Sequence, residues 1–205
     1  MAKKILVTAF EPFGGRGRNQ SLEVMARLKA PAGARLIKAR LPVSGRAVSA
    51  KVTALLKKHK PDIFISLGLA AGEAGLRVER FGVNILDYGI KDNAGWRPEG
   101  APVRAKGPAA YVVTLDPVKL AAAARRAGMP AYVSNHAGGY VCNTTIYSAL
   151  CAIEEAGLHT KYAFLHLPLT TEMVLAEKPG RASPPSLPLE LLVKAVTAAL
   201  KAAAR

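Results

Sequence analysis

Short apolar runs alternate along the chain with longer segments in which apolar residues recur at helical spacing. The apolar runs predict strands at residues 4–10, 35–41, 62–68, 131–135 and 162–167, with more polar strand-like segments at 77–86 and 111–115. The segments between them predict helices at residues 21–30, from a cap at Ser44 to about 60, from Asp116 to near 128, at 141–156, and from Pro185 or Leu187 onward.

Continuous apolar strands separated by helices are typical of a mostly parallel sheet with helices on both faces. We therefore predict an α/β fold over residues 1–205, a single doubly wound domain with a long polar loop at about 87–110. Ligands of such sheets bind beyond the carboxyl ends of the strands. The segments expected to hold a site are therefore residues 11–19, 69–79, 136–142 and 166–172.

A formal charge of +15 is typical of proteins that bind nucleic acid, so nucleic acid has to be considered as a partner. The basic residues are scattered, however, and their one dense run, residues 57–60, lies at the end of a predicted helix, where cations complement the helix dipole. No aromatic residues alternate with the basic ones as a stacking platform requires. Nucleic acid is therefore an unlikely partner, and a basic binding protein that kept the fold stays an alternative.

Compartment and redox state follow from what the sequence contains. No apolar run reaches the roughly 18 residues of a membrane span, and the N-terminal segment has no signal-peptide pattern. The chain has two cysteines, Cys142 and Cys151, which lie too far apart on one predicted helix to form a disulfide. We expect a cytoplasmic protein without membrane contact.

The segment before the predicted helix at 141–156 is suited to a nucleophile. Small residues end a strand there, and Cys142 falls where the helix begins. A helix N-terminus favours the thiolate over the thiol, and Gly138 and Gly139 allow backbone N–H groups to face a ligand. Cys151 lies among apolar residues inside the helix and is expected to serve packing.

Three further residues are candidates for the chemistry of a thiol nucleophile. His166 ends an apolar strand, 24 positions after Cys142, and is the favoured general base; His136, in the turn, is the second candidate. Contact between Cys142 and His166 is expected because adjacent parallel strands bring their ends together. Glu79, in the strand-like segment 77–86, could orient the imidazole, or could form a surface ion pair with Arg77 or Arg80.

The Gly-rich loop that follows the first strand contains two phenylalanines, Phe10 and Phe13. It matches neither the phosphate-binding nor the dinucleotide-binding pattern. The two rings could be core residues of a turn or an apolar wall for a flat ligand.

Together these segments resemble the pyroglutamyl peptidase I (pyrrolidone carboxyl peptidase) family. The matching phrases, in family order and spacing, are residues 7–15 (VTAFEPFGG), 78–80 (VER) with 83–84 (VN), 92–93 (DN), 134–135 (SN) with 137–138 (AG), 141–143 (VCN) and 166–168 (HLP). The resemblance implies a cysteine exopeptidase that releases N-terminal pyroglutamate from peptides without metal or cofactor. It also implies a homo-oligomer, a dimer or tetramer.

Carried over, the resemblance places the family's catalytic triad on Glu79, Cys142 and His166, and so favours His166 over His136 as the base. It implies a substrate pocket formed by six residues: Phe10, Phe13, Asn19, Leu69, Tyr140 and Val141.

The chain departs from the family pattern around this pocket. Gly89 stands where members usually carry Arg, and Lys91 stands where they carry Pro; Lys91 is the nearest cation that could substitute. Leu69 replaces a Gln that is thought to contact the lactam, and Tyr140 replaces Phe. These changes leave a diverged cysteine amidase for another small acyl group as an alternative function.

Overall fold

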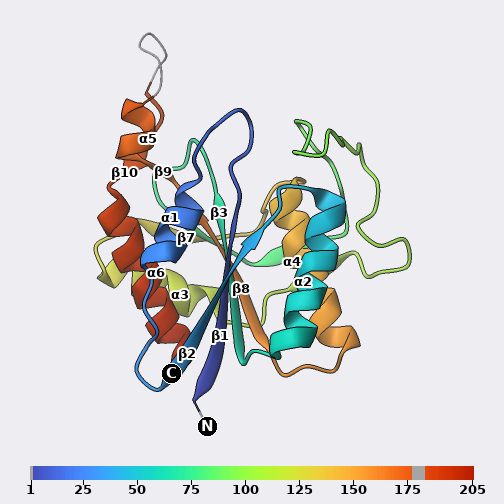
Figure 1. Ribbon diagram of the computed structural model, residues 1–205, viewed down its shortest axis with the longest axis horizontal. Coiled ribbons are helices and arrows are strands. Elements are labelled where there is room, and N and C mark those ends of the chain that lie inside the picture. The colour runs from blue at the N-terminus through green and yellow to red at the C-terminus, as the bar shows by residue number, and fades with distance from the viewer. Residues whose placement is uncertain (1, 177–182) are drawn as a thin grey trace.

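The computed structural model describes residues 2–176 and 183–205, which form one α/β domain around a six-stranded sheet (Figure 1). The strand order is β2-β1-β3-β8-β4-β7. The strands span Lys3–Phe10 (β1), Ala34–Leu41 (β2), Ile63–Leu69 (β3), Leu76–Glu79 (β4), Ala131–Ser134 (β7) and Lys161–Leu167 (β8). Every residue of β3 is buried, as its continuous apolar sequence predicts.

Four of the five strand pairings are parallel, and the exception lies at the centre of the site. Strand β4 pairs with β8 in the antiparallel direction and with β7 in the parallel direction. The predicted mostly parallel sheet is therefore confirmed. The expectation that β7 and β8 are adjacent parallel strands is wrong, because β4 lies between them and both β4 and β7 run against β8.

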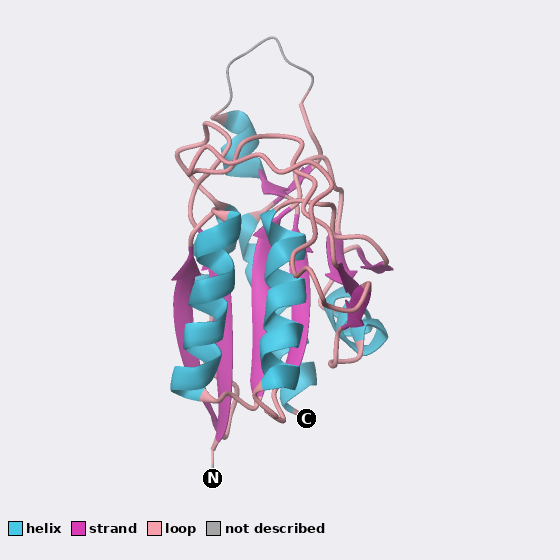
Figure 2. Cartoon of the chain, turned by 90° about the vertical axis from the view of Figure 1, so that its right-hand side faces the viewer, coloured by secondary structure: helices cyan, strands magenta, loops and turns pink. Residues whose placement is uncertain are grey.

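Helices cover both faces of the sheet (Figure 1). Helices α1 (Gln20–Arg27), α3 (Pro117–Arg126) and α6 (Leu189–Ala204) pack on one face in an aliphatic core, and α2 (Gly45–His59) and α4 (Val141–Glu155) pack on the other. Figure 2 shows α2 and α4 side by side, with the loops gathered beyond one end of the sheet. No helix in the described ranges is long and apolar enough to cross a membrane.

Several element boundaries differ from the prediction. The segment 77–86 is divided into β4 and a short strand β5 (Phe81–Val83), which pairs with β6 (Ala110–Val112). The last helix begins at Leu189, because Ser186–Leu187 forms β10 instead and pairs with β9 (Leu169–Thr170). A short helix, α5 (Thr171–Leu175), follows β9.

The predicted loop at 87–110 packs against the end of the domain that holds the segments expected to form the site. Ser44 occupies the N-cap position of α2, but its side chain makes no capping bond. Asp92 of the loop accepts the Gly45 N–H at 2.9 Å instead, and also accepts the N–H groups of Ala94 and Trp96. A helix N-terminus favours such a carboxylate. Asp92 therefore attaches the loop to the start of α2.

Candidate active site

A cavity of about 510 Å³ opens beyond the carboxyl ends of β3 and β8, which is where parallel sheets of this kind bind their ligands. Cys142 and His166 both line it. The walls come from the Gly-rich loop after β1, the residues that follow β3, strand β4 and the loop before α4. All four sequence segments that were expected to hold the site thus lie at this end of the sheet, and each of them contributes to the lining.

The antiparallel pairing of β4 with β8 brings Glu79 to His166. In this register Glu79 lies opposite Phe164 and Arg77 lies opposite His166, so all four side chains project from the same face. The diagonal neighbours meet, and His166 Nδ1 lies 2.7 Å from Glu79 Oε1. This bond makes Nδ1 the donor and leaves Nε2 available to the Cys142 thiol.

The Glu79–His166 pair is buried, with side-chain exposures of 0 % and 5 %. Burial alone raises the pKa of Glu79, but the hydrogen bond and charge of His166, with smaller contributions from Ser134 and Arg77, hold the pKa below its usual value. Burial lowers the pKa of His166, yet the charge and hydrogen bond of the Cys142 sulfur, together with Glu79, raise it to about 9. The site therefore favours a carboxylate next to an imidazolium.

Cys142 occupies the first turn of α4 and is half-buried. The N–H groups of a first helical turn have no partners within the helix, and the dipole there stabilises a thiolate. Asn143 fixes this turn: it is fully buried, its Oδ1 accepts the Val83 N–H, and its Nδ2 donates to the carbonyl groups of Val83 and Ile85, each at 2.9 Å.

The two glycines before α4 serve different needs. Gly138 has a φ of +80°, which suits glycine, and its N–H is already donated to His136 Nδ1 at 2.8 Å. A Cβ at Gly139 would lie 2.5 Å from the carbonyl oxygen of Asp87, so Gly139 allows the 87–110 loop to pack closely. The first-turn N–H groups of α4 are consequently better placed than that of Gly138 to receive an oxyanion.

His136, the second candidate base, also lines the cavity. It differs from His166 in its partner, because its Nδ1 accepts a backbone N–H rather than facing a carboxylate. Since Glu79 contacts His166 and not His136, the geometry favours His166 as the base.

The residues implied for the substrate pocket divide into two groups. Phe13, Leu69 and Tyr140 line the cavity, and the Phe13 and Tyr140 rings lie 6.0 Å apart. The other three are buried and are not among the lining residues: Phe10 packs against Phe164 in the core, Val141 belongs to the same core, and Asn19 caps α1. Asn19 also donates to the Glu11 carbonyl at 3.1 Å and so shapes the Gly-rich loop.

Two arginines that sequence reasoning did not assign to the pocket line it, Arg16 and Arg77. Lys91, the suggested substitute for the family's Arg, is exposed and is not among the lining residues; its carbonyl accepts the Tyr140 hydroxyl at 3.2 Å. Arg77 contacts Glu79, and this contact is buried rather than the surface ion pair that was the alternative reading. Arg77 and Glu79 lie two positions apart in β4 and so share one face of the strand, which was the one sign in the sequence that the two side chains lie together.

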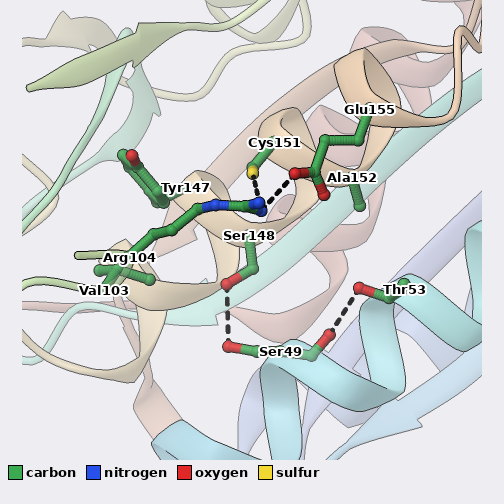
Figure 3. Close-up of a pocket in the computed structure, with 9 residues that line it drawn as sticks. All are labelled: Ser49, Thr53, Val103, Arg104, Tyr147, Ser148, Cys151, Ala152 and Glu155. Carbon is green, nitrogen blue, oxygen red and sulfur yellow. Dashed lines mark hydrogen bonds and ion pairs between the residues drawn. The ribbon is translucent and has the colours of Figure 1, made fainter. Parts of the chain in front are cut away.

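A second, smaller cavity of about 180 Å³ lies between α2 and α4 (Figure 3). Arg104 donates to Cys151 Sγ at 3.1 Å and pairs with Glu155, while Ser49 and Ser148 bond each other at 2.8 Å. Cys151 is buried, as its place in the apolar run predicts, but its contact with Arg104 was not expected. These polar groups satisfy one another, and neither Cys142 nor His166 lines this second cavity.

No group of three or more His, Cys, Asp or Glu side chains in residues 2–176 and 183–205 could hold a metal ion. A thiol, an imidazole and a buried carboxylate around one cavity of an α/β domain form the arrangement of a cysteine hydrolase.

The chain belongs to the pyroglutamyl peptidase family, whose model matches residues 3–205. It is 43 % identical over 199 residues to the pyrrolidone-carboxylate peptidase of Thermococcus onnurineus, covering 97 % of each chain. The solved pyrrolidone carboxyl peptidase of Thermococcus litoralis matches with a TM-score of 0.91 and 34 % identity, covering 98 % of this chain and 93 % of that one. Pyroglutamyl peptidase I of Bacillus amyloliquefaciens matches with a TM-score of 0.92 and 35 % identity, covering 98 % and 97 %.

Proposed function

We propose that the protein is a cysteine peptidase that hydrolyses the amide bond after an N-terminal pyroglutamyl residue and releases free pyroglutamate. The observation that carries the proposal is the Glu79–His166 pair beside Cys142, in a chain that matches the family along almost its whole length. The comparisons give no support to the two alternatives, a diverged amidase and a nucleic-acid-binding protein.

In the proposed mechanism the Cys142 thiolate attacks the carbonyl carbon of the scissile amide bond, not that of the lactam ring. The first-turn N–H groups of α4 stabilise the oxyanion of the tetrahedral intermediate. The His166 imidazolium protonates the leaving amine, and the neutral imidazole then activates the water that hydrolyses the thioester. Glu79 accepts the Nδ1–H throughout, which fixes the ring orientation and stabilises the imidazolium.

The composition of the cavity suits a pyroglutamyl group. The group is a neutral, flat lactam, so it requires apolar walls and no carboxylate to hold a terminal ammonium. Phe13, Leu69 and Tyr140 supply apolar surface, and none of the lining residues within 2–176 and 183–205 is acidic. We assign these three residues to the substrate pocket. Phe10, Asn19 and Val141 would act on it indirectly, through packing and the shape of the Gly-rich loop.

Turnover of matched chromogenic amides tests the function. We expect the pyroglutamyl amide to be cleaved. The prolyl amide has the same ring size but carries an ammonium, and it should be cleaved at least ~100-fold less efficiently, because the described part of the pocket lining offers that charge no carboxylate. Equal cleavage of both, or preference for an acetyl or other small acyl amide, would favour the diverged amidase. No cleavage of any amide would contradict the proposal.

Compartment and oligomeric state complete the proposed function. We propose that the protein acts in the cytoplasm and that it forms a homo-oligomer, a dimer or tetramer. Sedimentation velocity across a range of protein concentrations tests the second; a single monomeric species at all concentrations would contradict it.

A further inference from the structure

Arg77 lies at the point where the base-orienting carboxylate and the loop before the nucleophile meet. Its side chain is 18 % exposed and makes contacts through all three of its nitrogen atoms. Nε lies 3.1 Å from Glu79 Oε1 in an ion pair without an aligned hydrogen bond, and Nη1 donates to Glu73 Oε1 at 3.1 Å. Nη2 donates to Ser134 Oγ at 3.0 Å and also to the carbonyl of His136.

We propose that Arg77 is a positioning residue for the reaction: it shares the Glu79 carboxylate with His166 and attaches the 134–138 loop to it. The proposal rests on the proposed function for its kinetic consequence, but its electrostatic consequence can be measured without turnover.

His166 and Arg77 share one oxygen atom of the Glu79 carboxylate. His166 Nδ1 and Arg77 Nε both face Glu79 Oε1, at 2.7 and 3.1 Å. Two cations on one buried oxygen each reduce the stabilisation that the other receives. Arg77 therefore makes the imidazolium a stronger acid than Glu79 alone would allow, which favours proton transfer to the leaving amine. Within the described residues, the charged or titratable groups nearest to His166 are Cys142 from α4 and Glu79 and Arg77 from β4, and Arg16 and His136 line the same cavity.

Arg77 also bonds the loop at residues 134–138. Ser134 ends β7, and the residues after it lead through Ala137 and Gly138, which line the cavity, to Cys142. Through Nη2, Arg77 bonds the start of this loop at a side chain and at a backbone carbonyl. A guanidinium can make both contacts and face a carboxylate at the same time, whereas a lysine ammonium cannot reproduce this fork.

The test follows the pKa of His166 by NMR titration in wild type, Arg77→Met and Arg77→Lys. Arg77→Met should raise that pKa by about half a unit to one unit, because a neighbouring cation is removed. The basic limb of the kcat/KM profile for the pyroglutamyl amide should move the same way, and KM should rise by roughly 5- to 10-fold as the loop loosens. Arg77→Lys should keep the pKa near that of wild type while KM still rises.

Arg27→Met is the matched control, since Arg27 pairs with Glu190 at 2.9 Å on the exposed surface of α1 and α6. An unmoved His166 pKa in Arg77→Met would overturn the proposal, even if the rate fell. If Arg77→Met does not fold, Arg77→Lys decides, since an unchanged KM there contradicts the role of the loop contacts. Absence of turnover by wild type would count against the proposed function alone, because the NMR titration still tests Arg77.

Discussion

Gly68 lies directly opposite His166 in the parallel pairing of β3 with β8. A Cβ at Gly68 would lie 3.0 Å from His166 Cδ2 and 2.8 Å from the ring of Phe164. The absence of a side chain at Gly68 is thus what leaves room for the imidazole in the orientation that contacts Glu79.

Gly68→Ala should displace His166 and lower kcat/KM for the pyroglutamyl amide by roughly 100-fold, since small misplacements of catalytic groups have effects of that order. The extra methyl group should also reduce the free energy of unfolding by about 1–3 kcal/mol. Gly17→Ala is the control, because a Cβ there meets no atom within 4 Å. Full activity in Gly68→Ala would show that the imidazole does not need this space.

Asn143→Ala should destabilise the start of α4. The buried Asn143 side chain makes three hydrogen bonds to the backbone of β5 and Ile85, and their loss leaves buried backbone groups unpaired. We expect a decrease of about 3 kcal/mol in the free energy of unfolding, measured by urea denaturation, and a lower kcat because Cys142 lies next in the chain. Ser148→Ala, on the same helix, should change stability by much less; equal effects would contradict this role.

The activity should decline as pH rises through about 9. The pKa of His166 is raised to about 9 by the Cys142 sulfur and Glu79 against the opposing effect of burial. In the proposed mechanism the imidazolium protonates the leaving amine. The same raised pKa stabilises the fold fully below pH 6.5, and this contribution is lost as pH rises through about 9. In Cys142→Ser the pKa of His166 should fall, which NMR titration would detect. An unchanged value would contradict the thiolate–imidazolium pair.

Tyr140→Phe and Tyr140→Ala should separate the two contributions of this side chain. The phenylalanine variant loses only the hydroxyl bond to the Lys91 carbonyl and should keep KM within about 5-fold, since a hydrogen bond of this kind contributes about 1 kcal/mol. The alanine variant also loses the ring that lines the cavity and packs against Tyr88 at 4.7 Å. Its KM should rise at least ~10-fold. Equal KM values for both variants would remove Tyr140 from the pocket.

Much of this fold follows from its apolar pattern. The runs at 4–10, 62–68 and 162–167 become β1, β3 and β8, which are buried because helices cover both faces of the sheet. The direction of β4 did not follow, since alternation within a strand gives its faces but not its neighbours. Contact between Cys142 and His166 was expected for the wrong reason: the return of the chain before α4, not adjacent parallel strands, brings them together.

Two of the proposed catalytic groups have a local signal in the sequence, Cys142 at a helix start and His166 at a strand end, whereas Glu79 was selected by the family resemblance. For Arg77 the alternation with Glu79 was the one signal, and it did not reveal the role of the side chain, which depends on the register of β4 against β8 and on Ser134 from another strand. Phe10 illustrates the reverse case. The sequence left open whether its ring lines a pocket or fills the core, and the structure buries it against Phe164.

The most direct test of the account is to trap the acyl-enzyme. The wild-type protein is mixed with a pyroglutamyl ester, quenched in acid, and digested for peptide mapping by mass spectrometry. We expect a pyroglutamyl adduct on Cys142, none on Cys151, and none on any residue of Cys142→Ser. Turnover of the ester by Cys142→Ser at the wild-type rate, or an adduct on another residue of the wild type, would contradict the assignment of Cys142 as the nucleophile.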